Sequence, residues 1–204
     1  MRIPLFPLGT VLFPEGRLSL QIFEPRYLDM VGRCWRDALP FGVCLLTLGS
    51  EVRLPGSPEE SFQPYGTMAL IEELSTPHPG LILIRCRGTQ RFAVKEKPRR
   101  AHGAWTADID PIPDDPEVPV PEHLRITALG LKQILIDSAS KSDPEHGSAP
   151  TDWRFADCAW VANRWCELLD LPGALRHQLL SLDNPLIRLE LVTDILTQRM
   201  QDLS

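Results

Sequence analysis

The sequence has no apolar run near the roughly 18 residues that a membrane-spanning helix needs. Its start, Met1 to Pro14, is apolar, but three prolines interrupt it, and it lacks the charged beginning and small-residue cleavage site of a signal peptide. The five cysteines include no C-x-x-C pair, and an odd number of dispersed cysteines is typical of a reduced compartment. We therefore expect a cytoplasmic protein with no membrane association.

Motifs for several kinds of chemistry are also missing. None of the 13 glycines is followed by lysine, which excludes a nucleotide-hydrolysing phosphate loop, and there is no G-x-G-x-x-G, H-E-x-x-H or G-x-S-x-G. One S-x-x-K string, Ser138 to Lys141, would bring a lysine amine near a serine hydroxyl on a helix, but the S-D-N and K-T-G strings that accompany it in acyl enzymes are absent. A solvated helix end is the simpler interpretation. We expect no catalytic residue, metal or cofactor.

Bulk composition narrows the class of protein. Of the 204 residues, 43% are hydrophobic and 24% are charged, which is enough apolar material for a packed core and excludes global disorder. The formal net charge is −6, whereas a broad nucleic-acid-binding surface usually makes a domain basic. Nucleic acid is therefore a less favoured partner than protein.

Proline divides the chain. Residues 1–121 hold 16 of the 20 prolines, and five of these fall in residues 111–121. Proline is excluded from helix interiors, so the first part is expected to form strands and loops and the second part helices. The stiff, extended segment at 111–121 predicts a domain boundary. We place a β-rich domain at 1–116 and a helical domain at 117–204.

Short β-type runs between turn signals predict an antiparallel barrel or sandwich in the first domain. The expected strands are Arg2–Leu5, Leu18–Phe23, Phe41–Leu48, Gly66–Leu74, Leu81–Arg85, Arg91–Lys97 and Ala104–Ile109. One helix begins at Pro25, because Tyr27, Val31 and Cys34 then recur at helical spacing. The apolar periodicity of the second domain predicts four helices, at 122–140, 152–170, 174–182 and 185–202, the last capped by Asn184.

Positive charge is concentrated in residues 85–100, where only Glu96 opposes seven basic residues. On strands, alternate residues share a face, so these cations can gather on one surface with Phe92 nearby. This pattern keeps RNA binding open as an alternative function, against the simpler interpretation of a solvated hairpin face. The residues that would form the patch are Arg85, Arg87, Arg91, Lys95 and Lys97.

Trp153 and Trp160 lie seven residues apart on the predicted helix 152–170, and therefore share a face. We expect them to pack against the β domain, and exposure to a partner is the alternative. Trp165 belongs to the apolar stripe and is expected in the core.

An ordered series of motifs carries a resemblance to a known family. P-L-F-P-L at residues 4–8 is followed by V-L-F-P at 11–14 and I-F-E-P-R-Y at 22–27, and then by G-T-M-A at 66–69 and G-T-Q-R-F-A-V at 88–94. Over about residues 1–110 this order resembles the N-terminal substrate-recognition domain of the ATP-dependent Lon protease. The helical part is similar in layout to the bundle that follows in that family.

The resemblance implies an α+β protein, in which a PUA-like antiparallel β pseudo-barrel is followed by a four-helix bundle. It also implies binding of an unfolded polypeptide or protein partner. The ATPase and serine–lysine peptidase domains of complete Lon proteases are not found here, so we expect a stand-alone, non-enzymatic Lon-domain protein. A peptide can be held on exposed apolar side chains or along a sheet edge.

The motif residues suggest two roles. Pro25 starts a helix, Glu24 can accept hydrogen bonds at the helix N-terminus, Arg26 can pair with a carboxylate, and Tyr27 can pack inward, which together indicate a scaffold. The loops around Phe6, Leu12 and Phe13 are more apolar than proline-rich turns require. Exposed, these three side chains would form a polypeptide-binding patch, and burial is the alternative.

Overall fold

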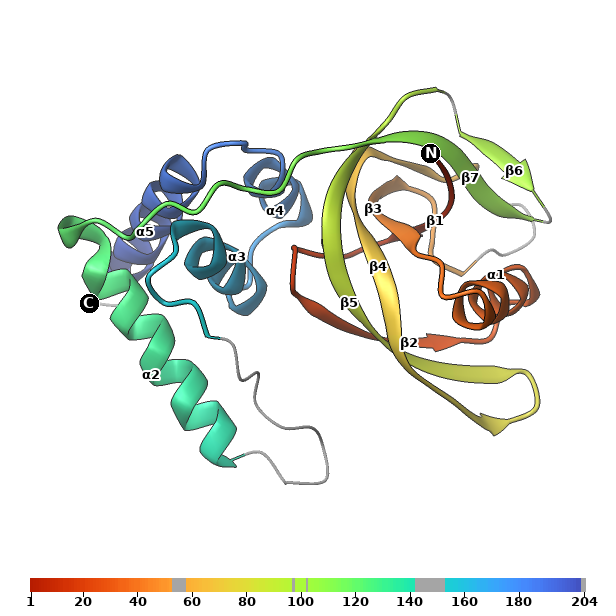
Figure 1. Cartoon of the computed structure of the whole chain (residues 1–204), viewed down its shortest axis with the longest axis horizontal. Helices are drawn as coiled ribbons and strands as arrows, with labels where there is room; N and C mark the ends of the chain where they lie inside the picture. The colour runs from red at the N-terminus through yellow and green to blue at the C-terminus, as the bar shows by residue number, and fades with distance from the viewer. Residues whose placement is uncertain (53–57, 97, 102, 142–152, 203–204) are drawn as a thin grey trace. The chain divides into compact units, whose positions relative to one another are not determined.

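The computed structural model describes residues 1–52, 58–96, 98–101, 103–141 and 153–202. It divides the chain into two compact units (Figure 1). The β unit comprises Met1–Asp114 and Leu171–Ser181, and the helical unit comprises Asp115–Asp170 and Leu182–Ser204. The sequence predicts a domain boundary between residues 116 and 117. That the parts on either side fold independently stays a prediction.

The strands of the β unit form a single mixed sheet with the order β2-β5-β4-β3-β1-β7-β6. A further pairing between β5 and β7 partly closes the sheet on itself. The β1–β3 pair is parallel and the other pairs are antiparallel, so the expected fully antiparallel sheet was wrong in this one pair. The strands are β1 (Arg2–Leu8), β2 (Arg17–Ile22), β3 (Phe41–Leu48), β4 (Ser61–His78), β5 (Leu81–Val94), β6 (Arg99–Ala101) and β7 (Ala104–Pro111).

Strand lengths differ from the sequence prediction in an informative way. β3 has the predicted bounds, but the two expected strands Leu81–Arg85 and Arg91–Lys97 are one continuous strand, β5. Gly88 and Thr89, which suggested a turn, lie within this strand. The short strand β6 was not predicted.

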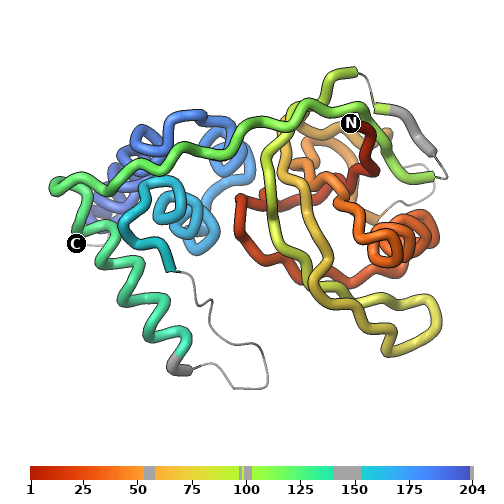
Figure 2. Tube along the Cα trace, in the orientation of Figure 1, coloured from red at the N-terminus to blue at the C-terminus, as the bar shows by residue number. Residues whose placement is uncertain are grey.

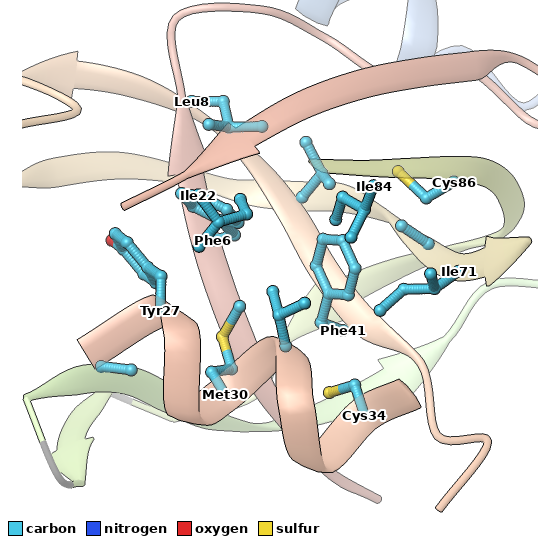
Figure 3. Packing of buried hydrophobic residues seen from close by; sticks show 14 of the residues in the cluster. Phe6, Leu8, Ile22, Tyr27, Met30, Cys34, Phe41, Ile71, Ile84 and Cys86 are labelled. Carbon is cyan, nitrogen blue, oxygen red and sulfur yellow. The ribbon is translucent and has the colours of Figure 1, made fainter. Parts of the chain in front are cut away.

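Helix α1 (Pro25–Arg36) covers the main core of the β unit. Pro25 occupies its first turn, where a missing N–H costs nothing. The apolar stripe of α1 packs against side chains of β1 to β5, and Figure 3 shows Met30 and Cys34 on the side of α1 that faces this cluster. Burial of residues far apart in sequence, such as Phe6 and Ile84, makes this cluster the main source of stability in the unit.

A second core cluster lies on the β3–β1–β7 side of the sheet, around Phe92 and Trp105. The Phe92 ring lies directly over Gly42 of β3, where a Cβ would be 2.6 Å from a ring carbon. Glycine at this position therefore allows the ring to pack on the backbone itself.

The helical unit consists, among its described residues, of a short 3-10 turn (Glu122–Leu124) and the helices α2 (Arg125–Lys141), α3 (Cys158–Leu168) and α5 (Pro185–Asp202). The predicted bounds of α5 are confirmed, and its Asn184 cap accepts from the N–H of Leu186 at 3.0 Å. Helix α3 is shorter than predicted because Asp157 caps it, accepting from the N–H of Ala159 at 3.2 Å.

Trp153 therefore lies outside α3, contrary to the shared helical face that we expected. It packs edge-on against Phe155, which in turn packs edge-on against the buried Trp160. Trp165 is in the core as predicted, and its indole N–H donates to the carbonyl of Thr127 at 3.0 Å. These rings thus pack within the helical unit itself.

A buried ion pair joins the first residue of the helical unit to α5. The guanidinium of Arg188 donates to both carboxylate oxygens of Asp115, at 2.6 and 3.3 Å. It also donates to the side-chain oxygen of Asn163 at 3.1 Å and to the carbonyl of Leu182. A buried guanidinium needs this many acceptors because each unsatisfied N–H would be costly.

Helix α4 (Gly173–Leu180) belongs to the β unit, although it follows α3 in the sequence. The buried Arg91 of β5 donates to the carbonyl of Leu180 at 2.9 Å, at the helix C-terminus, where a cation is favourable. At the other end of the helix, a Cβ built on Gly173 would lie 3.1 Å from a methyl carbon of Leu45 in β3. The α+β class is confirmed, whereas the predicted four-helix bundle is not.

Candidate functional site

Among the described strands, β2 lies at one end of the sheet and pairs with β5 alone. Just before β2, Gly88 of β5 donates to the carbonyl of Gly16 at 2.7 Å and accepts from the N–H of Glu15 at 2.8 Å. In an antiparallel ladder, alternate residues direct their backbone groups to opposite sides. From this register, the N–H and C=O of Arg17, Ser19 and Gln21 face away from β5. We call these groups the β2 edge.

Within the described part of the chain, no backbone hydrogen bond joins the β2 edge to another segment. The side chains of Arg17, Ser19 and Gln21 are exposed. Natural proteins usually protect such an edge with proline, charges or bulges. From Leu18 to Ile22, β2 carries none of these devices.

The local sequence explains why β2 is a strand with two different faces. Leu18, Leu20 and Ile22 point inward and pack against the main core, while the intervening residues point outward. This strict alternation is the pattern of a half-buried strand. Leu18 and Leu20 are only partly buried, however, as expected when no strand lies beyond them.

The segment leading into β2 is held firmly. The hydroxyl of Thr67 in β4 donates to the carbonyl of Leu12 at 2.6 Å, and the bonds of Gly88 fix Glu15 and Gly16. A Cβ on Gly88 would overlap the carbonyl oxygen of Phe13, so this close approach requires glycine. The start of the β2 edge is therefore positioned by contacts to β4 and β5.

The I-F-E-P-R-Y motif holds the other end of β2, where the chain passes directly into α1 (Figure 2). The carbonyl of Glu24 accepts from the N–H groups of Tyr27 and Leu28, both at 2.9 Å. The side chain of Glu24 makes no cap bond, contrary to prediction. It accepts instead from Arg26 Nε at 3.1 Å.

Arg26 is confirmed as the partner of a carboxylate. Its Nη1 donates to Glu60 at 2.8 Å, and the second oxygen of Glu60 accepts from the indole N–H of Trp105 at 2.7 Å. Burial lowers the pKa of Arg26, but the bond to Glu60, the adjacent Tyr27 and the bond to Glu24 outweigh it, so the pKa is raised. The group remains a fixed cation that ties α1 to β7.

Tyr27 is confirmed as an inward-packing residue. It is buried, and its ring stacks on that of Phe6 at 4.0 Å between centroids (Figure 3). The guanidinium of Arg26 lies 4.5 Å from the centroid of the Tyr27 ring. Glu24, Pro25, Arg26 and Tyr27 thus lie at the junction of β2 and α1, where Tyr27 stacks on Phe6 and Arg26 bonds to Glu60.

The apolar patch expected from Phe6, Leu12 and Phe13 is not on the surface. These side chains are 5%, 4% and 0% exposed, so the alternative of burial is the correct one. Phe6 also packs against Phe41, at 6.2 Å between ring centroids. Their apolar character supplies the core of the β unit, and they are not accessible to a ligand in this structure.

The basic segment is largely neutralised by acidic neighbours. Arg85 pairs with Glu73, Arg87 with Glu72 at 2.9 Å, and Lys95 with Asp110 at 2.8 Å. The pairing with Asp110 raises the pKa of Lys95. Cross-strand pairs of this kind are typical of a solvated sheet face.

Two more of the predicted basic residues do not contribute to such a patch. Arg91 is buried and contacts α4 rather than solvent, and Lys97 lies outside the described residues. The structure therefore does not assemble these five residues into one exposed cationic surface.

The remaining nucleophiles do not form a reactive site in the described part of the chain. Ser138 is exposed near the end of α2, and the side chain of Lys141 lies outside what the structure describes. All five cysteines are buried, and none of them forms a disulfide. Burial raises the pKa of Cys44 and Cys86 to about 12, which leaves no thiolate at neutral pH.

The β2 edge was not among the residues predicted for a site. The alternation at residues 17–22 did predict a strand, but alternation is the same in an edge strand and in an interior strand with one solvated face. Only the strand order distinguishes them. Also, no described helix carries an apolar stretch of the length and hydropathy needed to cross a bilayer.

Comparison with known proteins decides the family. Residues 2–198 match the family described as the ATP-dependent protease La (LON) substrate-binding domain. The chain belongs to this family. The match accounts for nearly the whole sequence, and it is to the substrate-binding domain of LON, not to its ATPase or peptidase domains.

Solved structures support the assignment of the LON substrate-binding domain. The chain is similar to a Lon N-terminal domain protein from Xanthomonas campestris, with 31% identity and a TM-score of 0.73 over 95% of this chain and 98% of that one. It also has the fold of the N-terminal domain of a Mycobacterium avium complex Lon protease, with a TM-score of 0.60 at 14% identity, covering 95% and 97%. The family supports a general role in recognising a protein or polypeptide.

Proposed function

We propose that this LON-domain protein binds extended, unfolded polypeptide by adding it as a strand to the β2 edge, without catalysing a reaction on it. The open edge is the observation that carries the proposal, because its three N–H groups and three carbonyls, in register and with no backbone partner among the described residues, suit a peptide backbone. Main-chain hydrogen bonds give affinity without requiring one particular peptide sequence. This breadth is what a substrate-binding domain needs.

The electrostatics of the sheet favour polypeptide over RNA. Arg85 and Arg87 of β5 are already paired with Glu73 and Glu72, and the formal charge of the chain is −6. Phosphate contacts would have to compete with these carboxylates. That all five cysteines are buried and not disulfide-bonded supports a reducing, cytoplasmic setting.

The first test is fluorescence anisotropy of a labelled, permanently unfolded polypeptide titrated with the protein, at low and high salt, beside a labelled single-stranded RNA. We expect the polypeptide to bind with little loss at high salt, because backbone and apolar contacts are weakly screened. Binding of RNA alone, with a steep loss at high salt, would show the alternative function. Failure of the polypeptide to bind would contradict the proposal.

A proline variant tests the edge itself. The N–H of Ser19 faces away from β5, so Ser19→Pro removes a donor from the β2 edge while keeping every bond to β5. We expect Ser19→Pro to weaken polypeptide binding at least tenfold and Ser19→Ala to bind like the parent protein. Unchanged far-UV circular dichroism and melting temperature establish that the proline variant is folded. Full binding by a folded Ser19→Pro protein would exclude this edge.

A further inference from the structure

The inner face of β2 ends in an incomplete apolar row. Leu18 and Leu20 pack against the core cluster but remain partly exposed on the side where no strand follows. Residues directly opposite one another in neighbouring strands have Cβ atoms about 5 Å apart. A strand added to β2 would thus place every second side chain beside these leucines.

The outer face of β2 has the opposite character. Arg17, Ser19 and Gln21 are exposed, and the adjoining strands carry ion-paired arginines and glutamates. Arg17 itself lies 3.7 Å from Glu72. Side chains of an added strand on this face would stay in water among polar groups, so apolar residues there would gain nothing.

From these two faces we infer that the site selects segments with apolar residues at alternate positions, rather than unfolded chains in general. The inference rests on the proposed strand addition at the β2 edge. β2 spans six residues, about 20 Å of extended chain, so the bound segment is about six residues long with three apolar side chains on the inner row. A proline whose nitrogen faces β2 would remove a donor and is disfavoured.

A second copy of the chain is a poorer occupant than a flexible peptide. Stable protein–protein interfaces bury about 1,200–2,000 Å² in total, and a ladder of six residues on each partner covers only a fraction of that area. An extended peptide needs no such area, because it brings only its own backbone and alternate side chains to the edge.

The test uses two fluorescein-labelled peptides of identical composition, one with valines at alternate positions among threonines and lysines, the other with the same valines contiguous. We expect the alternating peptide to bind the intact protein at least tenfold more tightly in anisotropy titrations. Leu20→Thr should reduce this ratio several-fold, while Gln21→Thr, on the outer face, should leave it unchanged. The peptide comparison on the parent protein stands even if Leu20→Thr fails to fold.

Each other outcome overturns a defined part of the argument. Equal binding of the two peptides would disprove the alternate pattern and leave polypeptide binding intact. Binding of neither peptide, nor of the unfolded polypeptide, would disprove the proposed function as well. A concentration-dependent dimer in sedimentation velocity that Ser19→Pro abolishes, with no peptide binding, would assign the edge to a second copy of the chain.

Discussion

Arg26 and Glu60 lie 34 residues apart and form an ion pair of 2.8 Å whose side chains are only 9% and 4% exposed. Glu60 also holds the indole N–H of Trp105, so one carboxylate joins the first turn of α1 to β7. The arginine of the I-F-E-P-R-Y motif therefore makes a structural contact between α1 and the rest of the β unit. It fixes the helix that follows β2, and with it the end of the edge strand.

Removing the charge of Glu60 should destabilise the β unit. We expect Glu60→Gln to lower the free energy of unfolding by about 2–3 kcal/mol, somewhat less than for a fully isolated buried charge, because Arg26 keeps its bond to Glu24. Urea denaturation followed by tryptophan fluorescence measures this loss. Asp29→Asn, on the exposed side of α1, is the matched control. Equal losses in the two variants would contradict a special role for Glu60.

A methyl group at Gly88 should disturb the segment that leads into β2. Gly88→Ala forces its Cβ against the carbonyl of Phe13, which is backbone and has little freedom to move, so we expect a loss of at least about 2 kcal/mol. Gly32→Ala in α1 meets nothing within 4 Å and should be neutral or stabilising by up to about 1 kcal/mol. Thermal melting of the pair provides the measurement, and similar effects of both substitutions would refute the close approach.

The same glycine shows where local sequence reasoning reaches its limit. A glycine followed by threonine resembles a turn, and it led to two predicted strands where β5 is continuous. The parallel β1–β3 pair was missed for a related reason, since pairing depends on which strands meet in space. By contrast, β3 and α5 were predicted with correct bounds, because apolar periodicity and a proline or asparagine cap are local signals.

Breaking the buried ion pair of the helical unit should be more costly than changing a surface charge. Asp115→Asn removes the carboxylate charge beside the guanidinium of Arg188, which is 1% exposed and also donates to the neutral acceptors of Asn163 and Leu182. We expect a loss of about 3 kcal/mol in unfolding free energy. The neighbouring Asp114→Asn, which is exposed, should change stability by less than about 0.5 kcal/mol. Guanidinium denaturation measures the unfolding free energy of both variants. An Asp115→Asn protein as stable as the parent would contradict a stabilising role for the Asp115–Arg188 pair.

Stability should also fall under mildly acidic conditions because of His177 in α4. Its Nε2 is buried and has no hydrogen-bond partner in the described structure. Burial lowers its pKa from 6.5, only partly opposed by a hydrogen bond to the backbone of Tyr65. The unfolded chain thus takes up a proton near pH 6.5 while the folded protein does so only at lower pH.

Stability contributed by neutral His177 is therefore present above about pH 6.5 and is lost as the pH falls toward the folded-state pKa. Unfolding free energies between about pH 5 and 7.5 should decline toward acid in the parent protein and decline less in His177→Gln. His78→Gln, at an exposed position, should retain the parent profile. Parallel profiles for parent and His177→Gln would refute the assignment.

The candidate site was less predictable than the fold. Phe6 and Phe13 attracted attention because apolar residues in proline-rich loops suggest exposure, yet their burial depends on Tyr27 and on Gly88, far along the chain. The edge strand, in turn, looked ordinary because the sequence shows which residues alternate and not which strand ends the sheet. Likewise, Arg85 and Arg87 suggested a basic patch in the sequence, but in the structure they form ion pairs with glutamates of the neighbouring strand.

The place of β1 in the sheet has a consequence for biosynthesis. β1 leaves the ribosome first, but its two neighbours are residues 42–45 of β3 and 105–108 of β7. The sheet therefore cannot be completed until Asp108 has emerged, and pairings of such long sequence separation are slow to form. Until then β1 lacks at least one of its two neighbouring strands. A protein that we propose binds unfolded chains is thus itself, during its own synthesis, an incompletely folded chain.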